Sequence, residues 1–182
     1  MTDADYKLPA PSTFPSLSEE EQTTVIRHLF ERSPTLESLI LPEFPTVKSY
    51  GELIAHSRAL LLNLASESRI DQEKRKVLLE ILAAHPRLGA GKIDSAHSAA
   101  EQASLQGETE ALAALNKEYE EQFPGLRYVV FVNGRARDVI MTNMRERIRR
   151  GQYELEKTEA ANAMCDIAID RARKLGAEFE YN

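Results

Sequence analysis

Two short motifs in the middle of the chain contain the residue types that acid–base chemistry requires. They are His85–Gly89, which reads HPRLG, and Ser98–Gln102, which reads SAAEQ. Residues three and four positions apart lie on one face of a helix, so Ser98, Glu101 and Gln102 would all point at one spot. An imidazole, a carboxylate and two neutral hydrogen-bonding groups are the parts of an acid–base site.

The histidine of the first motif is expected at the end of a helix. Pro86 disfavours the helical conformation at His85, and the helix dipole would then favour a protonated imidazole. Structural interpretations of the same residues stay open. Ser-x-x-Glu is also the capping box that begins ordinary helices, Gln102 could face solvent, and a His-Pro pair can simply end a helix.

The elements that must position these motifs are predicted to be helices. Apolar residues recur at helical spacing through most of the chain, with capping residues where helices would begin. Helices are expected from Ser16 or Ser18, after Ser33-Pro34, from Ser49, from about Asp71 to His85, from Ser98 to about Gln106 with Gly107 closing it, and over 108–122, 135–150 and 153–175. The expected fold class is an all-α, single-domain bundle of about eight helices, with residues 1–15 as an irregular N-terminal arm and 16–182 as the domain.

One run of the chain is predicted to be extended. Tyr128–Val132 combines aromatic and β-branched residues and precedes Asn133-Gly134, a composition that favours extended backbone. The sequence offers no second strand to pair with it. We therefore expect an extended loop buried between helices, whose N–H and C=O groups need other partners and could serve a ligand.

The arginines of the last two predicted helices are candidates for binding anions or for forming ion pairs. The six arginines of the 135–150 helix could bind phosphate, although a solvated charged face is the more common reason for such a run. Arg171 falls on the apolar stripe of the last helix, four residues from both Ile167 and Leu175. A charge on a buried stripe is rarely left unpaired. Arg171 therefore pairs with a core carboxylate, reaches out to solvent or binds an anionic ligand.

Composition narrows the class of protein. The chain has 182 residues and a net charge of −6 with both signs interspersed, which argues against a dedicated nucleic-acid binder. Cys165 is the single cysteine, so a reducing compartment is expected. We find no membrane span, signal peptide or Ser-Lys-Leu tail, and expect a cytoplasmic or peroxisomal protein. No HExxH or CxxC spacing occurs, so no metal site is expected.

Taken together and in order, the motifs resemble those of the 2-oxo-4-hydroxy-4-carboxy-5-ureidoimidazoline (OHCU) decarboxylases of urate breakdown. The resemblance covers about residues 16–176 and is carried by His85-Pro86-x-Leu88-Gly89, Ser98-x-x-Glu101-Gln102, Leu115-Asn116-x-x-Tyr119, Phe123, Val129–Val132, Gly134-Arg135, Arg147-Ile148 and Ile167-Ala168-x-x-x-Arg171. Arg87 and the Ala90-Gly91 loop depart from the family pattern and indicate a divergent, fungal-type branch.

The resemblance implies an all-α homodimer without metal or organic cofactor that converts OHCU to (S)-allantoin, functionally coupled to urate oxidase and 5-hydroxyisourate hydrolase. It implies that protonated His85 is the catalytic acid and Glu101 its carboxylate partner. The implied substrate-binding groups are Pro86, Ser98, Gln102, the main chain of Val129, Val130, Phe131, Val132 and Asn133, and Arg171. We expect Arg147 to form a structural salt bridge. The alternative is a helical interaction module that keeps this scaffold without turnover.

Overall fold

The structure, a computed structural model, describes residues 5–89, 96–102 and 109–179. These residues form helices joined by loops, and none of them belongs to a β-strand, which confirms the all-α prediction. The elements are η2 (Pro11–Ser16), α1 (Glu19–Leu29), α2 (Pro34–Ile40), η3 (Leu41–Glu43), α3 (Tyr50–Glu67), α4 (Gln72–Leu82), α5 (Ala96–Glu101), α6 (Thr109–Gln122), α7 (Arg137–Arg150) and α8 (Tyr153–Lys174). No helix of the described residues is both long enough and apolar enough to cross a membrane.

Side-chain caps fix the start of several helices. Ser18 begins α1 with a capping box, in which its hydroxyl accepts from the Glu21 N–H and the Glu21 carboxylate accepts from the Ser18 N–H. Ser33, Ser49 and Asp71 accept from backbone N–H groups at the starts of α2, α3 and α4. Each cap satisfies a donor that the helix itself cannot use. These starts agree with the sequence-based prediction.

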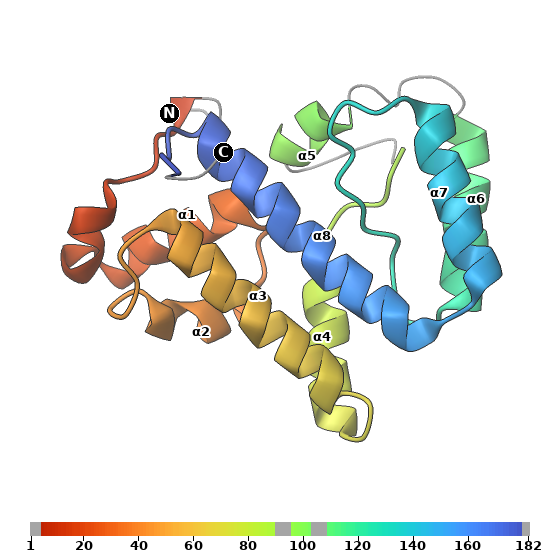
Figure 1. The fold of residues 1–182 in the computed structure, drawn as a ribbon, viewed down its shortest axis with the longest axis horizontal. Coiled ribbons are helices and arrows are strands. Elements are labelled where there is room, and N and C mark those ends of the chain that lie inside the picture. Colours follow the sequence, from red (N-terminus) through yellow and green to blue (C-terminus); the bar gives the residue numbers. More distant parts are fainter. Residues whose placement is uncertain (1–4, 90–95, 103–108, 180–182) are drawn as a thin grey trace.

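Helix α8 is the element around which the others are arranged (Figure 1). Its most extensive contact is with α3, and α1 packs on it as well. Helices α6 and α7 pack on each other and lie at the opposite end of the molecule from α1 and α2 (Figure 1). Small side chains such as Ala160, Ala161 and Ala168 are buried along α8, which allows neighbouring helices to approach closely.

The N-terminal segment is more ordered than the expected irregular arm. Residues 11–16 form a 3-10 helix, and Phe14 is fully buried with its ring edge-on to Phe44 and Tyr50. The hydroxyl of Tyr50 also donates to the carbonyl of Pro9, at 2.5 Å. An aromatic cluster therefore joins this segment to the core.

The extended run was predicted correctly, whereas the start of α5 was not. Residues 126–132 form neither helix nor strand, and Val129 and Val132 are buried. Helix α5 begins at Ala96, so Ser98 lies inside the helix and not at its cap. The predicted end near Gln106 and Gly107 lies outside the described residues.

Candidate active site

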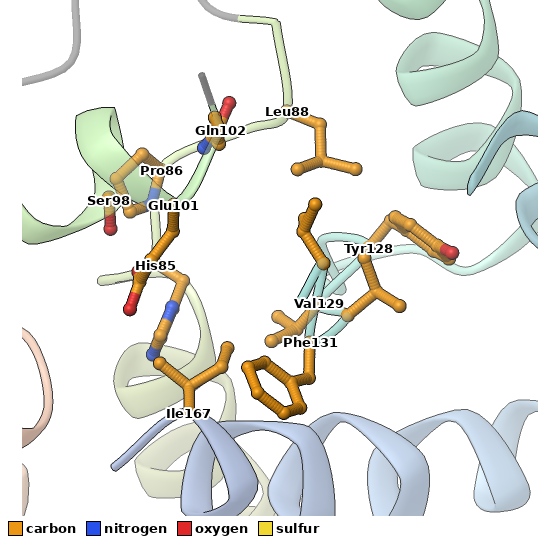
Figure 2. Close-up of a pocket in the computed structure, with 12 residues that line it drawn as sticks. His85, Pro86, Leu88, Ser98, Glu101, Gln102, Tyr128, Val129, Phe131 and Ile167 are labelled. Atoms are coloured by element: carbon orange, nitrogen blue, oxygen red, sulfur yellow. The ribbon is translucent and has the colours of Figure 1, made fainter. Parts of the chain in front are cut away.

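A pocket lies between the end of α4, helix α5, the extended segment and α8 (Figure 2). It contains about 400 Å³ of empty space, part of which is open solvent. Its lining residues are His85, Pro86, Leu88, Ser98, Glu101, Gln102, Tyr128, Val129, Val130, Phe131, Val132 and Ile167. The His85–Gly89 and Ser98–Gln102 motifs thus meet the extended segment, which lies further along the sequence.

The pocket has a polar wall and a main-chain wall. In Figure 2, His85, Pro86, Ser98, Glu101 and Gln102 stand on one side, opposite the extended segment, with Ile167 of α8 nearby. Most of the residues predicted to form the site are therefore brought together. Asn133 and Arg171 are predicted site residues that do not line the pocket.

His85 is almost completely buried, with 6% of its surface exposed. Burial, reinforced by the positive charge of Arg171, lowers the pKa of His85 from 6.5 to about 3. Among the described residues, no group forms a hydrogen bond with its Nε2. Desolvation thus opposes the protonated form that the helix end was expected to favour.

This neutral histidine should make folding stability depend on pH. In the unfolded state His85 binds a proton below its ordinary pKa of 6.5, whereas in the folded state it binds one only below a pKa of about 3. Stability from this residue is therefore present above pH 6.5 and is lost as the pH falls. Relative to His85→Gln, we expect the wild-type free energy of unfolding to drop by about 1.4 kcal/mol per pH unit between pH 6 and 4. Urea titrations at several pH values measure it, and parallel curves for the two proteins would contradict a neutral imidazole.

Arg171 forms the centre of a buried ion-pair cluster behind the polar wall. Its Nε and Nη2 donate to the two carboxylate oxygens of Glu101, both at 2.8 Å. Its Nη2 also meets Glu31 Oε1 at 2.9 Å and Ser98 Oγ at 3.1 Å, and its Nη1 meets the carbonyl of Phe30 at 2.5 Å. Every nitrogen of the guanidinium group is thus engaged. Of the alternatives left by the sequence, the pairing of Arg171 with core carboxylates is the one observed.

Glu31 is a member of this cluster that the sequence analysis missed. It lies just beyond α1, is 7% exposed, and accepts from the Ser98 hydroxyl at 2.5 Å. One carboxylate oxygen therefore holds both Ser98 and Arg171. The sequence contained a single hint, which was that a buried Arg171 required a carboxylate partner.

The loop after His85 is held by two side-chain amides. Gln102 accepts from the Gly89 N–H at 2.9 Å, and Asn116 donates to the Leu88 carbonyl at 2.8 Å. Gly89 has a φ of 69°, and a Cβ there would come within 2.9 Å of Leu112. Gln102 thus faces the protein and not solvent, and the loop requires glycine at this position.

Comparison with known proteins identifies the family. The family model of the OHCU decarboxylases matches residues 15–173, which is most of the chain. This chain belongs to the OHCU decarboxylase family. A crystal structure of an (S)-allantoin synthase shares the fold, with a TM-score of 0.61 and 18% sequence identity over 91% of this chain and 54% of that one. Our chain thus spans about half the length of that protein, and no curated protein matches its sequence.

In this member of the OHCU decarboxylase family, Asn133 belongs to a tight turn. Asn133 and Gly134 have φ values of 49° and 71°, and the Arg135 N–H bonds the Val132 carbonyl at 3.0 Å. Two central residues with positive φ characterise the type I′ turn, for which Asn-Gly is the favoured pair. Asn133 is exposed. The structure therefore gives this residue a backbone role at the end of the main-chain wall.

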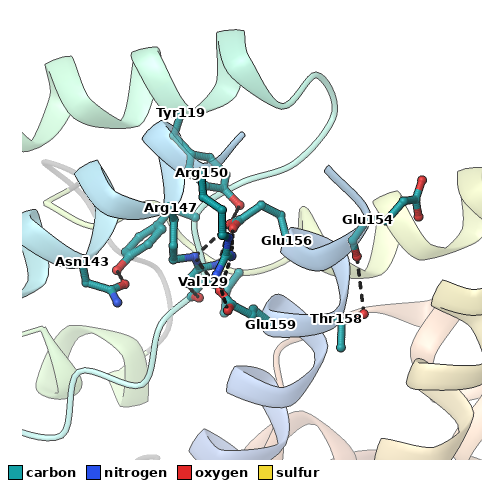
Figure 3. A network of polar contacts seen from close by, with 10 residues as sticks. Tyr119, Val129, Asn143, Arg147, Arg150, Glu154, Glu156, Thr158 and Glu159 are labelled. Atoms are coloured by element: carbon teal, nitrogen blue, oxygen red, sulfur yellow. Dashed lines mark hydrogen bonds and ion pairs between the residues drawn. The ribbon is translucent and has the colours of Figure 1, made fainter. Parts of the chain in front are cut away.

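Arg147, which matches a family arginine, forms the expected structural salt bridge (Figure 3). It lies 2.8 Å from Glu156 and 3.0 Å from Glu159, and it donates to the carbonyl of Val129 at 3.2 Å. Glu156 is fully buried and also accepts from Tyr119 at 2.6 Å and Arg150 at 2.7 Å. This network joins α6, α7 and α8 to the back of the pocket wall.

No group of three or more His, Cys, Asp or Glu side chains that could hold a metal ion occurs among the described residues. Burial raises the pKa of the Cys165 thiol to about 12, so this side chain is unsuited to proton transfer near neutral pH. The ionisable side chains that line the pocket are those of His85, Glu101 and Tyr128, and Glu31 and Arg171 lie behind Ser98 and Glu101.

Proposed function

We propose that this protein catalyses the loss of CO2 from OHCU to give (S)-allantoin during urate breakdown. Membership of the OHCU decarboxylase family supports the substrate class. The observation that carries the proposal is the pocket itself, where a buried neutral imidazole faces a wall of main-chain hydrogen-bonding groups. Such a site suits a small, polar, ureido-bearing molecule that must exchange protons during reaction.

Besides loss of CO2 and proton uptake by a ring nitrogen, the reaction requires two proton movements. OHCU carries a hydroxyl and a carboxylate on one ring carbon, and allantoin carries a carbonyl at that carbon and a hydrogen on the neighbouring one. When the bond to the carboxylate breaks, CO2 leaves and its electron pair moves into the ring, where a nitrogen takes one proton from solvent. The hydroxyl proton then has to leave, and the neighbouring carbon has to gain a proton.

A neutral His85 is suited to both transfers. Its unpartnered Nε2 can accept the hydroxyl proton, and the imidazolium so formed can return a proton to the neighbouring carbon. Because the imidazole stands on one side of the pocket, the proton arrives at one face of the ring. This geometry supports formation of a single enantiomer.

Glu101 takes a supporting role in this mechanism. Both of its oxygens accept from Arg171, and each keeps a further lone pair for a substrate hydroxyl or N–H group. Glu101 and Glu31 together carry one more charge than Arg171 neutralises.

We further propose that the protein acts as a homodimer in the cytoplasm or the peroxisome. Its substrate would come from the hydrolase that opens 5-hydroxyisourate, after urate oxidase has acted. These assignments follow the chemistry of the substrate and the family resemblance.

The direct test uses OHCU generated from urate by urate oxidase and 5-hydroxyisourate hydrolase. Addition of this protein should accelerate release of CO2 well above the spontaneous rate, in proportion to protein concentration. Loss of OHCU absorbance and release of labelled CO2 from urate report the reaction. An unchanged spontaneous rate would contradict the proposed function and favour a scaffold retained for interaction alone.

A further inference from the structure

The extended segment has two edges with different surroundings. On one edge, the carbonyl of Val129 accepts from Arg147 at 3.2 Å, and the carbonyl of Phe131 accepts from Arg135. On the other edge, no described residue bonds the N–H or C=O of Val130 or the N–H of Val132. In extended backbone, residues two apart point the same way, so the Val129 and Phe131 carbonyls lie on one edge. The Val132 carbonyl, where the turn begins, is also bonded by Arg135.

Peptide geometry links the two edges. The carbonyl of one residue and the N–H of the next belong to one planar trans peptide and point in opposite directions. The Val129 carbonyl points toward Arg147 of α7, so the Val130 N–H points away from α7. The α4–α5 wall of the pocket lies on that opposite side of the segment (Figures 1 and 2). The Val132 N–H points away from the Arg135 guanidinium, because it shares a peptide with the Phe131 carbonyl that this guanidinium holds.

We propose that Arg135 and Arg147 are positioning residues that hold this main chain from behind, so that the Val130 and Val132 N–H groups face the pocket as fixed donors. This inference rests on the proposed function for its catalytic consequence. The arginines do not touch the substrate. They act through the peptides they hold, and a cation on a carbonyl also strengthens the N–H donor of the same peptide.

Local sequence explains how Arg135 reaches its carbonyls. The Asn133-Gly134 turn folds the chain back, so that Arg135 follows immediately beside the segment it holds. Its Nε then donates to the Val132 carbonyl at 3.1 Å, and its Nη2 donates to that of Phe131. A guanidinium can hold two carbonyls with separate nitrogens, which a lysine ammonium would do poorly.

Arg135 provides the sharper test, because it is exposed and its removal leaves the core intact. We expect Arg135→Ala to raise the KM for OHCU by about 3- to 10-fold with kcat nearly unchanged, because the donors bind substrate and transition state alike. Arg135→Lys should recover part of this loss. Arg145→Ala is the matched control, since it removes the same charge from an exposed position on α7.

A second measurement separates this inference from the proposed function. Amide hydrogen exchange at Val130 and Val132, followed by NMR without substrate, should be faster in Arg135→Ala than in the wild type and in Arg145→Ala. If the wild type fails to accelerate OHCU decarboxylation, exchange alone decides the positioning role. Equal exchange and equal KM for Arg135→Ala and Arg145→Ala would overturn the inference.

Discussion

Replacing His85 by alanine is expected to lower kcat for OHCU decarboxylation by roughly 10²- to 10⁴-fold, the usual contribution of a positioned proton-transfer group. The imidazole is the one pocket group with an unengaged ring nitrogen among the described residues, and it is neutral in the free protein. Its loss removes both the acceptor of the hydroxyl proton and the donor to the neighbouring carbon. Steady-state kinetics with freshly generated OHCU measure the effect.

The control for this variant is His56→Ala. His56 is an exposed histidine on α3 that pairs with Glu43 at 3.0 Å, outside the pocket. Its replacement should leave kcat unchanged, and both variants should keep the helical circular dichroism of the wild type. A His85→Ala protein with wild-type kcat would remove the histidine from the mechanism.

Replacing Arg171 by methionine is expected to lower the free energy of unfolding by about 3–5 kcal/mol, because it leaves the buried Glu31 and the partly buried Glu101 without their counter-charge. Arg171 is 2% exposed and bonds Glu31, Glu101 and the Phe30 carbonyl together. Removing the carboxylates as well, in Arg171→Met/Glu31→Gln/Glu101→Gln, should recover a large part of the loss. Urea denaturation of the single and triple variants gives both values.

Arg173→Met serves as the matched control for Arg171→Met. Arg173 lies two residues further along α8 and is exposed, so its replacement should cost less than about 1 kcal/mol. If Arg171→Met is as stable as Arg173→Met, the buried cluster does not stabilise the fold. If the triple variant is stable and fully active, Glu101 and Arg171 have no part in catalysis.

Local rules predicted most of the fold. Ser18, Ser33, Ser49 and Asp71 cap helices where the sequence placed them, because a cap bond is made within three residues. The extended run was also predictable, because its aromatic and β-branched residues favour extended backbone. The sequence offered no partner strand, so a loop was expected in place of a sheet. The start of α5 was misplaced by two residues, because Ser98 donates to a distant carboxylate and does not act as a cap.

The electrostatics of the site depended on contacts that local rules do not describe. Glu31 and Arg171 are 140 positions apart in the sequence, so their pairing could not be predicted from local sequence patterns. The lowered pKa of His85 has the same origin. Its helix end was visible in the sequence, whereas its burial near Arg171 arises from tertiary packing.

The most direct measurement of the central claim is the handedness of the product. Urate is converted by urate oxidase and 5-hydroxyisourate hydrolase, with and without this protein, and circular dichroism of the accumulating allantoin is recorded. The account predicts rapid growth of the (S)-allantoin signal with the wild type and its loss with His85→Ala, because proton delivery comes from one face. Racemic allantoin at the spontaneous rate in the presence of wild-type protein would contradict it.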